Sequence, residues 1–194
     1  MRPLTWLGLL AVALVPAALT PRPLAALAHR AGPRPLTRHD FYSNIATGSS
    51  PTSAGTYYLD HAPLATVAGA AYPRALDLRP LGASAPAGVS VNTARFPGYR
   101  ALTFAVGVAD SDPVNAVAHV QVTVDRKPVW RQDLQQGQLA VPVTIPFGSR
   151  PQAVISIVAT TVHSGDGFID VIVGNAAVLP GGTRGPAACP PPSL

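Results

Sequence analysis

The chain of 194 residues carries a formal net charge of +5 and is 47% hydrophobic but only 12% charged. This balance supplies enough apolar side chains for a packed core and excludes a chain that is disordered throughout. The basic residues are scattered rather than gathered in runs, and the sequence holds no nucleic-acid-binding motif, so we expect no nucleic-acid partner. The single cysteine, Cys189, cannot form a disulfide within the chain, and it therefore leaves the redox compartment open.

Residues 1–28 have the features of a signal peptide. Arg2 provides a positive start, the run 4–19 is apolar, and Ala26–Ala28 has the small-x-small form that a signal peptidase recognises. Pro16 interrupts the apolar run, which is too short for a comfortable membrane span. We predict that this segment is cleaved and that the protein is secreted or held in the cell envelope of a bacterium, without a stable membrane span. An uncleaved anchor helix is the alternative.

Two segments of low complexity flank the part of the chain that we expect to fold. Residues 29–53 are rich in Pro, Gly, Ser and Thr and have no hydrophobic period, which predicts a flexible lead-in. Residues 180–194 are rich in Pro and Gly and are expected to form a disordered tail. A single domain is therefore predicted over residues 54–179.

Within that domain, short apolar segments alternate with turn signals. The predicted strands are Gly55–Leu59, Arg74–Leu78, Gly88–Thr93, Leu102–Val108, Ala118–Val124, Lys127–Gln132, Leu139–Ile145, Gln152–Thr160 and Phe168–Val178. The segment Asp60–Tyr72 shows no clear pattern, and we expect a loop with a helical turn there.

The hydrophobic pattern of individual strands predicts their place in a sheet. Apolar residues occupy every second position in Leu102–Val108 and Ala118–Val124, which indicates strands buried on one face. Pro142 cannot donate to a ladder and predicts an edge strand, whereas Gln152–Thr160 is apolar on both faces and predicts a central one. The spacing predicts an all-β sandwich of about 8–10 antiparallel strands, with a small closed barrel as the alternative.

Catalytic motifs are not recognisable in the sequence. Gly82–Pro86 lacks the second glycine of a nucleophile elbow, and His61, His119 and His163 do not have metal-ligand spacing. Most aspartates lie in turn-like contexts, where their side chains commonly bond nearby backbone groups. We therefore predict that the chain is not an enzyme.

One turn combines several oxygen donors. Asp110 and Asp112, followed by Asn115, offer the carboxylate and amide oxygens that calcium ions bind. The same residue types are also ordinary turn formers, which is the competing interpretation. Asp110 and Asp112 are the candidate ligands of a calcium ion.

Aromatic residues are the other candidates for a binding role. A sugar site commonly places an aromatic ring beside amide, carboxylate or guanidinium groups. The available aromatic residues are Tyr57, Tyr58, Tyr72, Tyr99 and Trp130. Each of them could instead fill the core or a strand end.

The stretch from Tyr99 to Lys127 resembles the NPCBM family, a novel putative carbohydrate-binding module found beside glycoside hydrolases that include family 98 enzymes. The matching segments are Tyr99–Phe104, Val106–Asp110 and Val120–Lys127, followed by Val173–Ala176 in the last predicted strand. Arg126 stands where the family usually has glycine, and the tryptophan of the family's terminal motif is missing.

The resemblance covers residues 54–179 and implies a galactose-binding-like jelly-roll β-sandwich, in which a structural calcium ion is common. It also implies that loops at one end of the sandwich bind galactose-containing glycans. The candidate ligand-binding residues are His61, Asn92, Tyr99, His163, Asp166 and Asn175. We expect a monomeric, non-catalytic carbohydrate-binding module. A structural or protein-binding module of the cell envelope with the same fold and no sugar ligand is the alternative.

Overall fold

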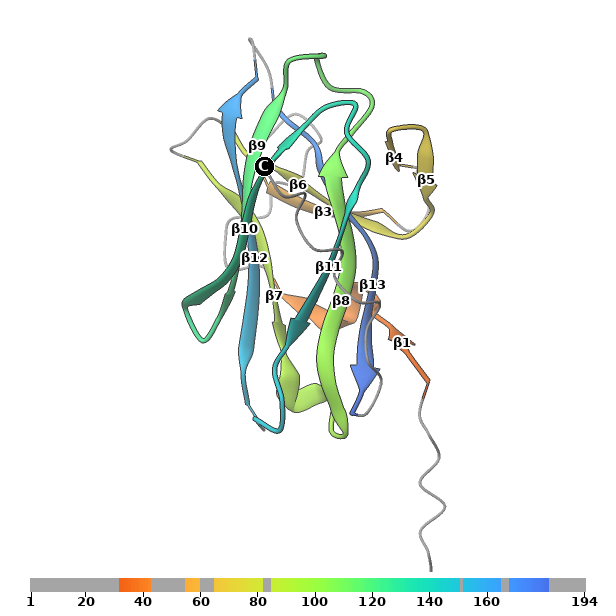
Figure 1. The fold of residues 1–194 in the computed structure, drawn as a ribbon, viewed down its shortest axis with the longest axis vertical. Coiled ribbons are helices and arrows are strands. Elements are labelled where there is room, and N and C mark those ends of the chain that lie inside the picture. The colour runs from red at the N-terminus through yellow and green to blue at the C-terminus, as the bar shows by residue number, and fades with distance from the viewer. Residues whose placement is uncertain are drawn as a thin grey trace, which may run out of the picture.

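The computed structural model describes residues 32–42, 55–59, 65–81, 85–150, 152–164 and 168–181. The first of two sheets contains β1 (Arg34–Pro35), β3 (Gly55–Leu59), β6 (Ala75–Arg79), β8 (Tyr99–Val108), β11 (Val141–Pro146) and β13 (Val171–Pro180). The second contains β2 (Phe41–Tyr42), β7 (Ala87–Asn92), β9 (Val117–Val124), β10 (Lys127–Gln135) and β12 (Val154–His163). A separate hairpin consists of β4 (Ala65–Val67) and β5 (Ala70–Tyr72), and two 3-10 helices are η1 (Arg38–Asp40) and η2 (Thr93–Arg95). Figure 1 shows the sheets as two layers, with the hairpin standing outside the first.

The strands from β6 to β13 form a jelly roll. The first sheet has the order β11-β8-β13-β6-β3, and the second has the order β10-β9-β12-β7-β2. Successive strands therefore pass from one sheet to the other, except for the β9–β10 hairpin, and their pairings are antiparallel. This arrangement is the double-sheet jelly roll, and it confirms the predicted all-β sandwich.

The core lies between the two sheets and is built by alternation along each strand. On β9, Ala118, Val120 and Val122 are fully buried, whereas His119 and Gln121 on the other face are half-buried. The same pattern recurs on β8 and β12, so the inner faces of both sheets supply one continuous cluster of Leu, Ile, Val and Phe side chains. Burying each such side chain contributes about 1.5–3 kcal/mol, which makes this cluster the main source of stability.

Two positional predictions within the sheets are confirmed. β11, which contains Pro142, is an edge strand that pairs only with β8. β12 lies between β9 and β7, as the apolar residues on both of its faces predicted. Proline is tolerated at the edge because its missing N–H removes no bond to a second neighbour.

The segment Asp60–Tyr72 differs from the prediction. Residues 65–72 form the β4–β5 hairpin instead of a helical turn. Its turn residues Ala68 and Gly69 both have left-handed φ angles, of 47° and 77°. A two-residue hairpin turn of this type requires positive φ angles at both positions and usually has the sequence Asn-Gly. Here the first position is alanine, so the turn could not be predicted from the sequence.

The flexible lead-in predicted for residues 29–53 is wrong for residues 34–42. β1 pairs with β13, β2 pairs with β7, and Leu36 is buried in the main core with 4% of its surface exposed. These strands are only two residues long, so no period could show in the sequence. Residues 32–42 are called the strap below, because they connect an edge of one sheet to an edge of the other.

The remaining boundary predictions fall outside the described residues. These predictions are the signal peptide at residues 1–28, the rest of the lead-in and the tail beyond residue 181. In the part of the chain that the structure describes, no helix is long and apolar enough to cross a membrane.

Candidate functional site

An irregularity in β13 creates the candidate site. β13 pairs with β6 through Val171–Gly174 and, on the same edge, with β1 through Ala177–Val178. Asn175 and Ala176 lie between these two pairings, and the register of β13 against β8 also shifts there. Asn175 has a left-handed φ angle of 54°. Such a bulge breaks the ladder and turns a side chain away from its regular direction.

The strap closes the gap beside this bulge. The backbone N–H of Leu36 donates to the carbonyl oxygen of Ala176 at 2.8 Å. The strap itself is braced by Asp40, whose side chain is almost fully buried. One Asp40 oxygen accepts a hydrogen bond from Arg34 Nη2 at 3.1 Å, and the other accepts from the backbone N (2.9 Å) and Oγ1 (3.0 Å) of Thr37.

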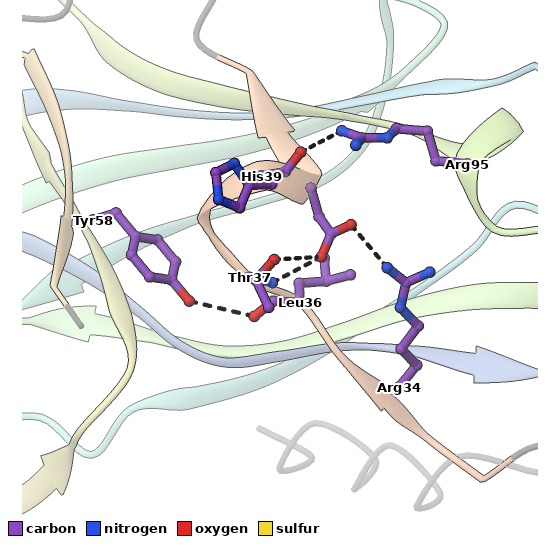
Figure 2. A network of polar contacts seen from close by, with 7 residues as sticks. Arg34, Leu36, Thr37, His39, Tyr58 and Arg95 are labelled. Carbon is purple, nitrogen blue, oxygen red and sulfur yellow. Dashed lines mark hydrogen bonds and ion pairs between the residues drawn. The ribbon is translucent and has the colours of Figure 1, made fainter.

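Further contacts fasten the strap to the sandwich, as Figure 2 shows. The hydroxyl group of Tyr58, on β3, donates a hydrogen bond to the Leu36 carbonyl oxygen at 3.4 Å. The Arg95 guanidinium donates to the carbonyl oxygen of His39. The Arg34 guanidinium lies 4.8 Å from the centroid of the Phe96 ring. The strap is thus a fixed wall of the fold rather than a linker.

A cavity of about 480 Å³ lies between the strap, β3, the start of β6 and the β13 bulge. We call it the strap pocket and define it by Leu36, Phe41, Tyr58, Arg74 and Asn175. The half-buried rings of Phe41 and Tyr58 lie 6.3 Å apart, tilted by 42°. The volume lies within the range of about 300–1,000 Å³ that is common for small-ligand sites.

Two polar side chains of the strap pocket are uncommitted. Arg74 and Asn175 are both exposed, and neither makes a hydrogen bond or ion pair with the described residues. The pocket therefore combines an aromatic wall with a guanidinium group and an amide that are available to a ligand.

Of the six predicted ligand-binding residues, Asn175 lies in the strap pocket. Asn92 and Tyr99 lie at one end of the sandwich. The Asn92 side chain accepts a hydrogen bond from the Ala94 N–H at 2.9 Å and caps η2. Tyr99 is half-buried at the start of β8 and lines a second cavity of about 280 Å³.

His163 lies at the other end of the sandwich. Asn92 pairs with the first residue of β12, and exposed His163 is its last residue, so about 30 Å of strand separates them at 3.3 Å per residue. His61 and Asp166 are outside the described residues. The predicted ligand residues that the structure describes therefore do not converge on one end of the sandwich.

Asp110 and Asp112, the predicted calcium ligands, both bind backbone amides. Asp110 accepts from the N–H groups of Ala68 (2.7 Å) and Gly69 (2.9 Å), one with each oxygen, and these bonds lower its pKa. Asp112 accepts from the Asp170 N–H at 2.8 Å, and its burial raises the pKa of its carboxyl group to about 7. Together they hold the β4–β5 turn and the start of β13 in place.

This donor set does not fit a calcium site. Calcium requires six to eight oxygen ligands, whereas both Asp110 oxygens and one Asp112 oxygen are already occupied by N–H groups. Among the described residues, no three His, Cys, Asp or Glu side chains are grouped so that they could hold a metal ion. The calcium ion stays a prediction without support from these residues.

A second polar cluster, which sequence reasoning missed, surrounds Arg79. Its Nε lies 2.8 Å from Asp77 Oδ2 and 2.8 Å from Asp170 Oδ1, and its guanidinium lies 5.3 Å from the Tyr57 ring centroid. Asp112 joins the cluster through the Asp170 N–H. The cluster therefore connects β3, β6, the start of β13 and the loop after β8.

Asp77 is the buried member of this cluster. Desolvation and the nearby Asp170 charge raise its pKa to about 7, although Arg79 opposes the shift. Its Oδ1 is buried and has no hydrogen-bond partner among the described residues. Asp77 alternates along β6 with the core residues Leu76 and Leu78, so its side chain lies on the outer face of the sheet. That face is covered there, because Ala75 and Ile172 on the same face pack against the β4–β5 hairpin.

Comparison with known proteins identifies the fold. No protein-family model and no curated protein match the sequence. Among solved structures, the tandem CBM51 modules of Sp3GH98, the family 98 glycoside hydrolase from Streptococcus pneumoniae SP3-BS71, match with a TM-score of 0.55 and 11% identity. The match covers 75% of this chain and 46% of that chain, so this chain spans about half of the tandem pair. It confirms, at the level of the fold, the resemblance to a module found beside family 98 enzymes.

Two further matches have lower TM-scores. CBM51 from Clostridium perfringens GH95, solved in complex with methyl-galactose, has a TM-score of 0.47 and 13% identity and covers 63% of this chain and 99% of its own. CBM51-2 with the INT domains of Clostridium perfringens ZmpB, solved in complex with GlcNAc, has a TM-score of 0.49 and 13% identity. It covers 71% of this chain and 29% of its own.

Proposed function

We propose that this chain is a non-catalytic carbohydrate-binding module and that its sugar lies in the strap pocket. One observation carries the proposal: a single cavity combines the rings of Phe41 and Tyr58 with the uncommitted side chains of Arg74 and Asn175. A sugar ring has an apolar C–H face that packs on aromatic rings and hydroxyl groups that need hydrogen-bond partners. The strap pocket offers both.

The fold supports this proposal without deciding it. The Sp3GH98 match consists of carbohydrate-binding modules, but one fold can serve many functions, and the ligand has to be argued from the site. The site that we propose also differs from the expected one. It lies at the side of the sandwich, between the strap and the β13 bulge, instead of in the loops at one end.

The lining of the strap pocket favours binding over catalysis. The described residues that line it include no carboxylate, imidazole or thiol group. Hydrolysis of a glycosidic bond commonly requires two carboxyl groups that flank the bond. The carboxylates of the Arg79 cluster are engaged with a guanidinium or a backbone amide.

Galactose-containing glycans are the first ligands to test, because the family resemblance in the sequence implies them. Export through residues 1–28 would bring the module to such extracellular glycans, and we propose it together with this function. A monomer is sufficient to bind the sugar, since the residues that define the strap pocket all come from one chain.

A glycan array followed by calorimetry with the best ligand tests the proposal. Asn175→Gly removes the amide while glycine keeps the left-handed φ angle without strain, and we expect it to weaken binding about tenfold. Asn115→Gly, on the exposed loop after β8 and outside the lining of the strap pocket, is the matched control and should bind like the wild type. Equal affinity of wild type and Asn175→Gly would exclude the strap pocket as the site. A chain that binds no glycan would favour the structural envelope module.

A further inference from the structure

Arg74 lines the strap pocket and has no anionic partner among the described residues, unlike Arg34 and Arg79. Arg34 is paired with Asp40 at 3.1 Å, and Arg79 lies between Asp77 and Asp170. Arg74, by contrast, makes no ion pair or hydrogen bond with any described residue. It lines the strap pocket as the first residue after Pro73.

The surroundings of Arg74 favour an anion over a cation. The described lining of the strap pocket contains no carboxylate that could compete for the guanidinium. Asp40, the acidic residue of the strap, is already paired with Arg34 and hydrogen-bonded to Thr37. The Asn175 side chain adds amide N–H donors on the same cavity.

The shape of the guanidinium group specifies the kind of anion further. Its N–H donors lie in one plane and match the two oxygens of a carboxylate, which gives a bidentate pair about twice as strong as a neutral hydrogen bond. A neutral hexose offers Arg74 hydroxyl oxygens that accept hydrogen bonds, but no negative charge to pair with the guanidinium.

We propose that the strap pocket binds a sugar that carries a carboxylate, that is, a hexuronic acid residue. Arg74 holds the carboxylate, Asn175 binds a neighbouring oxygen, and the sugar ring packs on Phe41 and Tyr58. This inference rests on the proposed sugar-binding function of the same pocket and specifies its ligand class.

Calorimetric titration of the full chain with three methyl glycosides at low salt tests the inference. The ligands are methyl galactoside, methyl galacturonide and a methyl galactoside that carries a sulfate group. We expect the galacturonide to bind about tenfold more tightly than the galactoside, and added salt to reduce that preference.

Two variants separate the role of Arg74 from the general charge of the protein. Arg74→Gln should erase the preference and bring galacturonide and galactoside to similar affinities. Arg131→Gln removes the same charge from an exposed position on β10 and should keep the preference intact. Retention of the full preference in Arg74→Gln would overturn the assignment of the carboxylate to Arg74.

The remaining outcomes distinguish the inference from the function on which it rests. Galactoside and galacturonide of equal affinity would overturn the acidic-sugar inference and leave the sugar-binding function in place. Tighter binding of the sulfated sugar than of the galacturonide would also overturn it, because the site would then select a different anion. Absence of binding to all three sugars, with no glycan retained on an array, would overturn both.

Discussion

Tyr72 lies so close over Gly174 that a Cβ added to Gly174 would come within 2.1 Å of Tyr72 Cδ1. Tyr72 ends the β4–β5 hairpin, and Gly174 is the last residue of β13 before the bulge at Asn175. The glycine therefore lets the hairpin dock directly on the first sheet, next to the strap pocket. It is this docking that covers the outer face of the sheet near Asp77.

Gly174→Ala should destabilise the fold, because the new methyl group meets a buried ring rather than the tip of a flexible side chain. Overpacking of this kind costs about 1–3 kcal/mol in the free energy of unfolding, measured by urea denaturation. Gly32→Ala is the control: a Cβ there meets nothing within 4 Å, and we expect a change below about 0.5 kcal/mol. Equal stability of Gly174→Ala and wild type would show that the hairpin does not dock as described.

Asp40→Ala should loosen the strap and weaken sugar binding together. It removes the acceptor of three hydrogen bonds from Arg34 and Thr37, at an expected cost of about 1–3 kcal/mol in stability. Hydrogen exchange at the Leu36 amide, which bonds to Ala176, should become faster.

The control for the strap prediction is Arg38→Ala. Arg38 is an exposed residue of η1 and should leave stability, exchange and sugar affinity unchanged. Undiminished affinity in Asp40→Ala, despite faster exchange at Leu36, would mean that the strap does not shape the ligand site.

Stability should fall as the pH rises toward neutrality. Burial raises the pKa of Asp77 from 3.8 to about 7, so the folded chain holds this proton more tightly than the unfolded chain does. The stability that this provides is complete below pH 3.8 and is lost as the pH rises through about 7. Asp112, whose pKa is also raised to about 7, acts in the same direction.

Asp77→Asn tests this dependence, because an amide stays neutral at every pH while keeping the shape of the carboxyl group. Urea denaturation at about pH 5 and about pH 8 should show a smaller loss of stability for the variant than for the wild type. A variant that loses as much stability as the wild type between these two pH values would contradict a protonated Asp77 in the fold.

Calcium should leave the melting temperature unchanged. Both oxygens of Asp110 and one oxygen of Asp112 accept hydrogen bonds from the backbone N–H groups of Ala68, Gly69 and Asp170. These oxygens are therefore not available to bind a calcium ion. Thermal unfolding in millimolar calcium and in excess chelator measures this directly, since an ion that binds only the folded state raises the melting temperature. A higher melting temperature in calcium would point to ligands other than this turn.

Most of the sandwich could be predicted from local sequence patterns. The period of two in Leu102–Val108 and Ala118–Val124, the position of Pro142 and the apolar segment Gln152–Thr160 each describe how one strand meets solvent and its neighbours. These are properties of single strands, so the sequence carries them directly.

Segments without a period could not be predicted in this way. The strap contributes two strands of two residues each. The turn of the β4–β5 hairpin has Ala68 at the position where asparagine would predict a hairpin turn. In both cases the structure is stabilised by contacts with residues far away in the sequence, such as Leu36 in the core and Tyr72 on Gly174. Asp77 was missed for the same reason, because its burial depends on the docked hairpin.

The sequence by itself therefore predicted an all-β sandwich and most of its longer strands, and the family resemblance implied the jelly roll. Only the tertiary structure decided where a ligand could bind. Phe41, Tyr58, Arg74 and Asn175 come from four separate segments, and no spacing in the chain connects them. They meet because β13 pairs with β6 before Asn175 and with β1 after it. The cavity lies at the gap between these two pairings, where neither strand is hydrogen-bonded to this edge of β13.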